Sequence, residues 1–524
     1  MGRGQQMSMY DVEKSIPGGG LRSMTKRRVV VVALVSFFLP FVITSTYLYY
    51  TTPDAATEAM LFLQRRPFSG FSPSLTDDTN ASSIINDTTG SETNTTDSLD
   101  AKQEEVDAED TDPEAIELDP SETNSSANET SAALESSLQE QAKNSTSEIL
   151  PLLTMGLSNT TNSTKKEACD LVKGSWVPDS RPPQYTNSTC GFIQGHQNCM
   201  KNGRKDRGFL HWKWKPDQCE LPRIDPPSFL TAMRDRSMAF AGDSIARNQF
   251  QSLLCVLSQV EQPDHTYNAP DDRDNVWVFR KHNFTLAIYW SPYLVHVEDK
   301  EITFSSDNQT RTVAFIHVDR LDKAWVDRIP GVDILQLSTG QWWFKRGLFL
   351  QEGKPLGGHI CDGWAECEKE IGFADPYRTT IRTILRGSLS IPGYSGTTIL
   401  RTFAPEHFEG GSWNNGGQCV RTAPGGVPVS SLTKWMYDIQ MEEFLNVTSA
   451  TSGSEKDRIK VLDITNLAQI RADGHPNSFM RFQPFAKEFT QKIQNDCLHW
   501  CLPGPIDTWN DLLVESLRDA VYKQ

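Results

Sequence analysis

All ten cysteines of this 524-residue chain lie between Cys169 and Cys501, and this feature restricts the fold more than any other. An even number of cysteines confined to one part of a chain predicts disulfide bonds, which persist in oxidising compartments such as the secretory lumen. A metal site formed by Cys497, His499 and Cys501 is the alternative. Oxidation would exclude it, because the sulfur of a disulfide is not a metal ligand.

A stretch without charged residues, residues 29–50, is long enough to span the ~30 Å hydrocarbon core of a bilayer. Four basic residues lie just before it: Arg22, Lys26, Arg27 and Arg28. Because basic residues stay on the cytosolic side, we expect a cytosolic tail at 1–28, a type II transmembrane anchor at 29–50 and a lumenal remainder. A cleaved signal peptide would need a shorter apolar core and a small-residue cleavage site.

The next segment, residues 51–168, carries 23 acidic and 6 basic residues, so it accounts for the net charge of −16 of the whole chain. Low hydrophobicity with high net charge predicts a disordered stem. N-x-S/T sequons favour glycosylation of this stem in the lumen, and an unmodified linker is the alternative. Eight sequons lie in the stem: Asn80, Asn86, Asn94, Asn124, Asn128, Asn144, Asn159 and Asn162. Four more lie beyond it: Asn187, Asn283, Asn308 and Asn446.

The remaining residues read as a small cysteine-rich module at 169–222 and an α/β domain at 223–524. Short apolar runs predict strands, and two segments have helical spacing of apolar residues. The predicted strands are 237–244, 284–290, 312–318, 332–340, 397–406 and the start of 458–468, and the predicted helices are 245–259 and 376–389. Strands that end in Gly, Asp, Ser or Thr are expected where strand ends build a site.

Ser244 lies between a predicted strand and a predicted helix, in the sequence Gly-Asp-Ser. There the helix N-terminus offers backbone N–H groups to a developing oxyanion, which suits a nucleophilic serine. A serine at this point is equally suited to cap the helix. The sequence around Ser244 does not decide between the two interpretations.

Asp496 and His499 are three residues apart near the C-terminus, between Cys497 and Cys501. This spacing allows the carboxylate to accept the Nδ1–H of the imidazole, as in a Ser–His–Asp set. An aspartate that caps a turn beside an ordinary histidine would look the same. Disulfides on both sides of His499 favour the catalytic interpretation, because catalytic groups need a rigid support.

Three segments together resemble the plant trichome birefringence-like family of polysaccharide O-acetyltransferases: FAGDSIARNQ, HFEGGSWNNGGQCVRT and DCLHWCLPGPIDTWNDLL. Residues 169–222 resemble the cysteine-rich module of that family, so the likeness runs from about Cys169 to Leu513. The resemblance implies a fold like that of the SGNH or GDSL hydrolases, with a parallel sheet flanked by helices. It also implies a Golgi-resident type II enzyme that acetylates cell-wall glycans, and RNQFQSLLCVLSQVEQP is most similar to members acting on xyloglucan side chains.

Carried over by position, the resemblance assigns the nucleophile to Ser244, the base to His499 and the orienting carboxylate to Asp496. It places Arg247 near the oxyanion or the sugar. It also implies four disulfides: Cys169–Cys219, Cys190–Cys255, Cys199–Cys501 and Cys419–Cys497. Cys361 and Cys367 are left over and are close enough in sequence for a local bridge.

Other residues offer weaker signals for substrate binding. Gly340 ends a predicted strand and is either a second oxyanion donor or only a strand terminator. Trp342, Trp343 and Trp413 follow strands, where their rings would either stack on sugars or belong to the core. His407 and Glu409 suggest structural hydrogen bonding, and His475 is a packing residue or a substitute for His499.

An acetyl donor is expected as co-substrate, with no bound cofactor, no metal and no nucleic-acid partner. The expected partners are a cell-wall polysaccharide and the Golgi membrane, and the sequence does not indicate protein partners. Acetylation of xylan, mannan or pectin, an acetyl esterase, and a non-catalytic glycan-binding protein remain alternatives. The esterase needs the same three residues, since only the acceptor of the acetyl group differs.

Overall fold

The computed structural model describes residues 169–487 and 494–522. Its strands are β1 Gly174–Pro178, β2 Trp212–Pro216, β3 Ser237–Gly242, β4 Asp264–Asn268, β5 Asn275–Phe279, β6 Phe284–Trp290, β7 Val295–Thr303, β8 Thr310–Leu321, β9 Ile334–Ser338, β10 Gly347–Gln351, β11 Lys354–His359, β12 Thr397–Arg401 and β13 Ile459–Leu462. Its α-helices are α4 Pro226–Ala232, α5 Ser244–Ser258, α6 Lys323–Val326, α7 Ala374–Leu389, α8 Ser431–Ala450, α9 Thr465–Gln469, α10 Asp507–Ser516 and α11 Arg518–Tyr522.

A search of these described ranges finds no helix that is both long and apolar enough to cross a bilayer. The predicted anchor at 29–50 and the predicted stem at 51–168 lie outside them.

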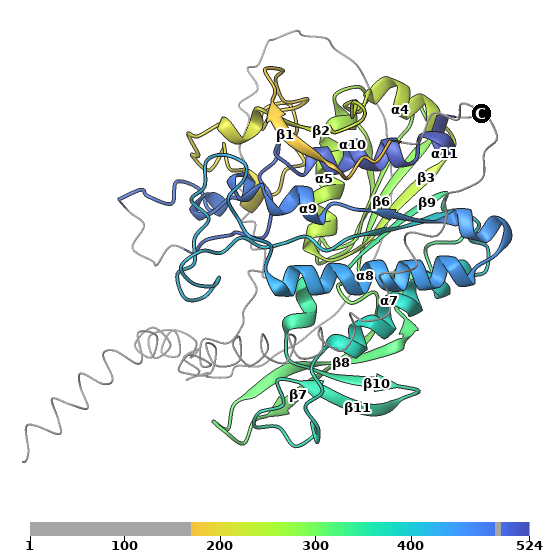
Figure 1. Ribbon diagram of the computed structural model, residues 1–524, viewed down its shortest axis with the longest axis vertical. Helices are drawn as coiled ribbons and strands as arrows, with labels where there is room; N and C mark the ends of the chain where they lie inside the picture. Colours follow the sequence, from red (N-terminus) through yellow and green to blue (C-terminus); the bar gives the residue numbers. More distant parts are fainter. Residues whose placement is uncertain (1–168, 488–493, 523–524) are drawn as a thin grey trace, which may run out of the picture. The chain divides into compact units, whose positions relative to one another are not determined.

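The largest sheet has seven strands in the order β13-β12-β9-β3-β6-β5-β4 (Figure 1). Its first five strands run parallel, as expected for the predicted fold. The last two, β5 and β4, pair antiparallel, so the sheet is mixed rather than wholly parallel. Strand β3 lies in the middle of the sheet, which places the residues that follow it at the centre of one edge.

Side chains alternate between the two faces along each strand of this sheet, and helices cover both faces. On β3, Met238 and Phe240 belong to a core cluster with residues of α4, α5 and α10. Ala239 and Ala241 point to the opposite face, where they join a cluster with residues of α7 and α8. The central strand is therefore buried on both sides, which explains its continuous apolar sequence.

A second sheet of four strands, in the order β11-β10-β8-β7, packs beside α7 (Figure 1). The predicted strand at 312–318 belongs to this sheet and not to the large one. Sequence reasoning missed β7, β10 and β11, together with the 20-residue helix α8. The strand β7 has polar residues at most of its positions, so its apolar pattern is weak.

The cysteine-rich module contains one antiparallel pair, β1 and β2, and is otherwise made of loops and short 3-10 turns. Five disulfides join the ten cysteines: Cys169–Cys219, Cys190–Cys255, Cys199–Cys501, Cys361–Cys367 and Cys419–Cys497. These pairs are those that the family resemblance implies, with the local bridge added. Two of them connect the module to later parts of the chain, at α5 and at the C-terminal loop.

Candidate active site

Ser244 is the first residue of α5, and a single residue separates it from the end of the central strand β3 at Gly242. The helix cap is the preceding residue: the Asp243 carboxylate accepts the backbone N–H groups of Ile245 and Ala246 at 3.1 and 3.3 Å. The interpretation of Ser244 as the helix cap is therefore wrong, since Asp243 already satisfies these N–H groups. The Ser244 hydroxyl is thus available for another partner.

That partner is His499, whose Nε2 lies 2.8 Å from Ser244 Oγ. The other ring nitrogen, Nδ1, donates to Asp496 Oδ2 at 2.8 Å. Asp496 is held in turn by the backbone N–H groups of Leu498 and His499, which donate to its Oδ1 at 3.0 and 2.9 Å. With Nδ1 protonated, Nε2 is the acceptor that a serine hydroxyl needs in order to lose its proton.

The electrostatics of this pair follow from its burial. Burial raises the pKa of Asp496, but the His499 charge and hydrogen bond outweigh this effect and hold that pKa well below its usual range. Burial lowers the pKa of His499, whereas the Asp496 carboxylate raises it, and the net pKa of His499 lies above its ordinary value of 6.5. Asp496 thus stabilises the imidazolium that would form during proton transfer.

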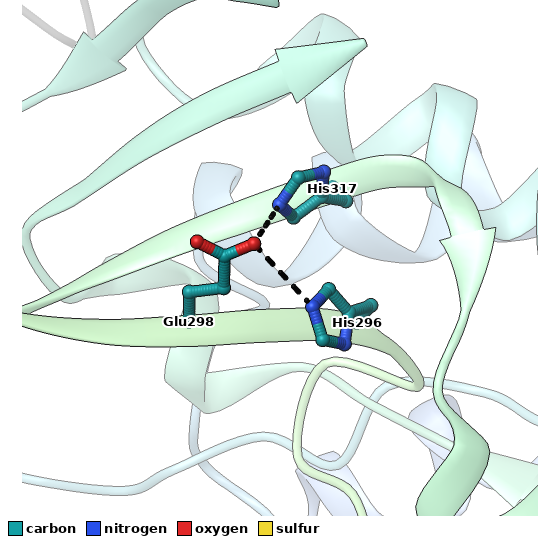
Figure 2. Close-up of side chains that lie close together, drawn as sticks. All are labelled: His296, Glu298 and His317. Carbon is teal, nitrogen blue, oxygen red and sulfur yellow. Dashed lines mark hydrogen bonds and ion pairs between the residues drawn. The ribbon is translucent and has the colours of Figure 1, made fainter. Parts of the chain in front are cut away.

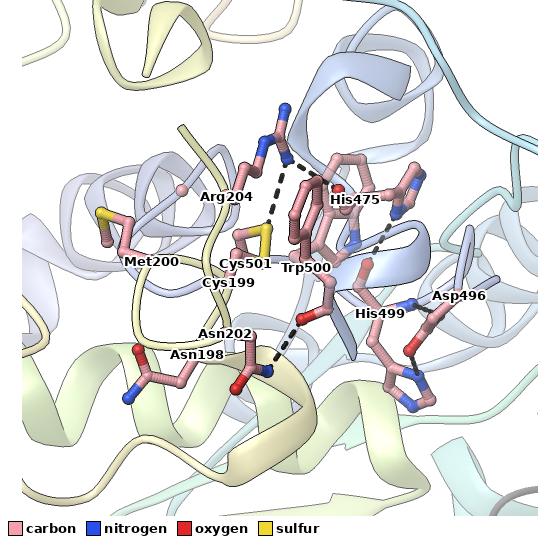
Figure 3. Close-up of a disulfide and its surroundings, with 12 residues drawn as sticks. Asn198, Cys199, Met200, Asn202, Arg204, His475, Asp496, His499, Trp500 and Cys501 are labelled. Carbon is pink, nitrogen blue, oxygen red and sulfur yellow. Dashed lines mark hydrogen bonds and ion pairs between the residues drawn. A yellow bond between two sulfur atoms is a disulfide. The ribbon is translucent and has the colours of Figure 1, made fainter. Parts of the chain in front are cut away.

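Disulfides hold the loop that carries these two residues. Cys497 is bonded to Cys419, and Cys501 is bonded to Cys199 of the cysteine-rich module, which Figure 3 shows beside Asp496 and His499. The metal site considered for Cys497, His499 and Cys501 is excluded, because both sulfurs are in disulfides. The loop itself is neither helix nor strand.

A buried asparagine, Asn248, joins this loop to the helix of Ser244. It lies on α5, accepts the Trp500 N–H at 2.7 Å and donates to the Trp500 carbonyl at 3.2 Å. The backbone next to His499 is therefore tied to the helix that begins at Ser244. Sequence reasoning missed Asn248, although it stands in the quoted GDSIARNQ segment.

His475 lies behind the loop. Its Nδ1–H donates to the His499 carbonyl at 2.6 Å, and its ring packs against that of Trp500 with centroids 4.2 Å apart (Figure 3). Its Nε2 is hydrogen-bonded to His407 Nδ1 at 2.6 Å. Glu409 instead pairs with Arg421 at 2.7 Å. These contacts give His475, His407 and Glu409 structural roles.

Arg247 and Gly340 are the two residues predicted to bind the oxyanion or the substrate, and they lie on different elements near Ser244. The buried Arg247 guanidinium lies over the Trp290 ring, and its Nε has no hydrogen-bond partner among the described residues. Its charge lowers the pKa of His499, as expected for a cation close to the imidazole. Gly340 follows β9, whose Ser338 pairs with Gly242, so Gly340 is at the same sheet edge as Ser244. A Cβ at position 340 would come within 2.7 Å of the Phe403 ring.

The three predicted sugar-stacking tryptophans differ in burial. Trp343 is 1 % exposed and donates its Nε1–H to Thr339 Oγ1, so the prediction for Trp343 is wrong and its ring belongs to the core. The half-buried Trp342 meets Trp290 edge to face, and the Lys345 ammonium lies 3.3 Å from its ring centroid. Trp413 is half-buried in a loop.

Two aromatic residues near the site were not predicted. His196 of the cysteine-rich module packs edge to face on His499, with ring centroids 5.2 Å apart. Trp290 ends β6 opposite Gly242, and the guanidinium carbons of Arg247 and Arg273 each lie 5.4 Å from its ring centroid. Position at the end of a strand beside the Gly-Asp-Ser turn was the signal that could have revealed Trp290.

Two family descriptions match the chain. Residues 221–516 match the GDSL/SGNH-like acyl-esterase family found in Pmr5 and Cas1p, and residues 167–220 match the PMR5 N-terminal domain. The first match alone covers more than half of the chain. The chain belongs to the trichome birefringence-like family of GDSL/SGNH-like acyl-esterases.

Individual members of this family align with most of their length. Xyloglucan O-acetyltransferase 1 of Arabidopsis thaliana is 43% identical over 352 residues, which cover 67% of this chain and 80% of the relative. Protein trichome birefringence-like 24 of the same plant is 40% identical over 356 residues, 67% of this chain and 82% of the relative. Xyloglucan O-acetyltransferase 1 of Populus trichocarpa is 39% identical over 384 residues, 71% of this chain and 87% of the relative.

Proposed function

We propose that this protein transfers acetyl groups to hydroxyls of a plant cell-wall polysaccharide, with xyloglucan side chains as the acceptor, through an acetyl-enzyme on Ser244. One observation carries the proposal: His499 lies 2.8 Å from Ser244 Oγ on one side and 2.8 Å from Asp496 on the other. The names of relatives that are about 40% identical to this chain support acetyl transfer and xyloglucan.

The first half-reaction moves the acetyl group from donor to serine. His499 Nε2 takes the Ser244 proton while Oγ bonds to the acetyl carbonyl carbon, whose oxygen becomes an oxyanion. Collapse of this intermediate breaks the bond to the leaving group, which takes the proton from the imidazolium. Asp496 keeps Nδ1 protonated throughout and stabilises the positive ring.

The second half-reaction releases the acetyl group to the sugar. A sugar hydroxyl gives its proton to His499 Nε2 and attacks the acetyl-serine carbonyl. The Ser244 oxygen then leaves with that proton, which restores the free enzyme. Water in place of the sugar would make the protein an esterase, so the outcome depends on which hydroxyl reaches the acetyl-enzyme.

The oxyanion is proposed to be bound by the backbone N–H of Ser244, at the positive end of α5, and by that of Gly340. Arg247 is proposed to contact the oxyanion or the sugar. Its buried Nε without a protein partner supports this role, because a buried donor is costly unless a ligand accepts its hydrogen bond. Half-buried Trp342 and Trp413 are proposed to contact the glycan.

The protein is further proposed to lie in the Golgi membrane, anchored by residues 29–50 with its catalytic domain in the lumen. The four sequons in the described part support a lumenal site, because Asn187, Asn283, Asn308 and Asn446 are all exposed. Digestion with an N-glycosidase tests this arrangement. A protein from plant Golgi membranes whose mass does not fall after digestion would contradict glycosylation.

An acetyl-transfer assay on the full-length chain in detergent tests the activity. Separate oligosaccharides of xyloglucan, xylan, mannan and pectin are supplied with an acetyl donor, and the mass gain of each acetyl group is followed. We expect gain on xyloglucan, and a loss of about 10⁴-fold or more in Ser244→Ala. The matched control is Ser237→Ala, which should retain activity. Ser237 begins β3, the strand whose other end leads to Ser244.

Three outcomes would contradict parts of the proposal. Mass gain that survives in Ser244→Ala would exclude the serine mechanism. Gain only on another glycan would change the acceptor. Loss of acetyl groups from pre-acetylated glycans, without gain on bare ones, would identify an esterase.

A further inference from the structure

Two histidines and a glutamate gather on the second sheet, on strands that the proposed catalysis does not use. His296 and Glu298 lie on β7, and His317 lies on β8 (Figure 2). The pairing of β7 with β8 is irregular between Val295 and Val297, and Figure 2 shows that His296 and Glu298 nevertheless lie on the same side of β7. Val297 pairs with Ile316 across the strands, which brings His317 next to them.

The side chains converge on one carboxylate oxygen. Glu298 Oε1 lies 3.1 Å from His317 Nε2 and 3.6 Å from His296 Nε2, and the three atoms all lie within 4.8 Å of one another. Zinc binds histidine nitrogen at about 2.0–2.1 Å and carboxylate oxygen at about 2.0–2.2 Å, which places tetrahedral ligand atoms about 3.4 Å apart. The two distances to Glu298 bracket this value, and the two imidazole nitrogens, which lie within 4.8 Å of each other, would approach the ion by side-chain rotation.

We propose that His296, Glu298 and His317 form a Zn²⁺ site that joins β7 to β8. Two imidazoles and one carboxylate are a ligand set that suits zinc, whereas Mg²⁺ and Ca²⁺ prefer oxygen ligands alone. His317 is nearly buried, with 9 % of its side chain exposed, while Glu298 is 43 % exposed. The ion would therefore sit at the sheet surface, where water completes its coordination.

Two cations beside Glu298 oppose the ion. Lys300 Nζ lies 3.4 Å from Glu298 Oε2, and an Arg320 nitrogen lies 3.8 Å from Oε1. They neutralise the carboxylate without zinc and repel the metal when it binds. Their removal should therefore strengthen zinc binding, which is the opposite of what removal of a ligand does.

The proposed zinc site shares no residue with the proposed triad. A short segment of the chain nevertheless links it to the turn beside Ser244. The connection from β6 to β7 begins at Ser291, whose N–H donates to the Gly242 carbonyl at 2.9 Å. His296 follows five residues later, at the start of β7. Zinc would thus order the strand that continues from the turn beside Ser244.

Titration calorimetry with ZnCl₂ on the full-length chain in detergent, freed of metal with EDTA, tests the site. We expect one tight equivalent, weakened by more than ~100-fold in His296→Ala, Glu298→Gln and His317→Ala, because loss of a ligand exceeds the 10–100-fold cost of losing a supporting partner. The acidic segment 51–168 will bind cations weakly and equally in every variant. MgCl₂ titrated in place of ZnCl₂ should show no such equivalent.

Variants that keep all three ligands test the site even if a ligand variant misfolds. Lys300→Gln should bind Zn²⁺ several-fold more tightly, since it removes a competing charge without removing a ligand. The exposed His211 offers a matched control, and His211→Ala should bind zinc like the unaltered chain. The visible spectrum of Co²⁺ titrated into the same protein would report ligand geometry.

Several outcomes would overturn the proposal. These are the absence of a tight equivalent, equal binding in all variants, and binding that is lost in His499→Ala but kept in His317→Ala. The last would place the ion at the candidate triad. Acetyl transfer measured in the presence of EDTA is a separate readout, so failure of the zinc site leaves the proposed function intact.

Discussion

Ser244 lies where a regular strand meets a regular helix, whereas Asp496 and His499 lie in an irregular loop. The strand of Ser244 is hydrogen-bonded on both sides, to β6 and β9. The loop has no such ladder and makes only single backbone contacts, such as the isolated bridge between Asp496 and Asn477. Two disulfides, at Cys497 and Cys501, add covalent support.

The difference shows two physical routes to the same positional accuracy. A central strand is fixed by many backbone hydrogen bonds that form together, so its end varies little in position. Ordering a loop costs a large amount of conformational entropy. Cross-links and buried side chains offset this cost. Here Asn248 connects the two regions, since it belongs to the helix of Ser244 and bonds the backbone of the loop at Trp500.

The largest effect is expected from Asp496→Asn, which leaves both regions in place but removes the charge beside His499. We expect kcat to fall about 10⁴-fold, because an amide neither fixes the imidazole tautomer nor stabilises the imidazolium. Acetyl transfer at saturating donor and acceptor measures this. A loss of less than about tenfold would contradict the role of Asp496.

The pH profile of the same variant gives the sign of the charge effect. A protonated His499 cannot accept a proton, so kcat/KM of the unaltered chain should rise with pH through a pKa above 6.5. Without the Asp496 charge this pKa falls, and the acidic limb should move to lower pH. Glu409→Gln, the same chemical change at a carboxylate bonded to Arg421, should leave the limb in place.

A smaller effect is expected when the covalent support of the loop is removed. Cys199→Ala/Cys501→Ala should lower the free energy of unfolding by about 2–5 kcal/mol, because this disulfide joins residues 302 apart in sequence. Denaturant unfolding measures this, and kcat should fall as well, because His499 loses its support.

The matched control is Cys361→Ala/Cys367→Ala, which opens a bridge between residues only 6 apart. It should cost less stability, since a short loop loses little entropy on closure. It should also leave kcat unchanged, because this bridge lies against the second sheet. Equal losses of kcat in both double variants would show that the disulfides do not position the loop.

Asn248→Ala separates the two regions without touching the triad and should lower kcat less than Asp496→Asn does. The variant leaves the Trp500 N–H and carbonyl without partners, at about 1–3 kcal/mol of stability for each group. A shift of His499 by about 1 Å would lower kcat about 100-fold.

Asn510→Ala separates positioning from stability, because Asn510 also bonds α5, through Gln249 and Ser252, but makes no hydrogen bond to the described residues of the loop that carries His499. It should lose similar stability and keep its kcat at temperatures where it is folded. A kcat equal to that of Asn248→Ala would show that the asparagine does not position His499.

Sequence reasoning identified the elements around the site where local pattern was strong. Strand β6 agrees with its predicted range, and α5 agrees to within one residue at each end. The antiparallel edge formed by β4 and β5 and the separate sheet of β7, β10 and β11 were missed. Strands β4, β7 and β11 consist mostly of polar residues or of proline and glycine, so their apolar pattern is weak, whereas β5 and β10 are apolar but only five residues long.

The sequence by itself determined which residue types were present for acyl transfer: a serine after a strand, and an aspartate and a histidine three apart between two cysteines. Only the tertiary structure decided their roles. It assigned the helix cap to Asp243, which left Ser244 for His499, and it buried Trp343 in the core. The reason is physical: the Ser244–His499 and Asn248–Trp500 hydrogen bonds join residues about 250 positions apart, and no local pattern records such contacts.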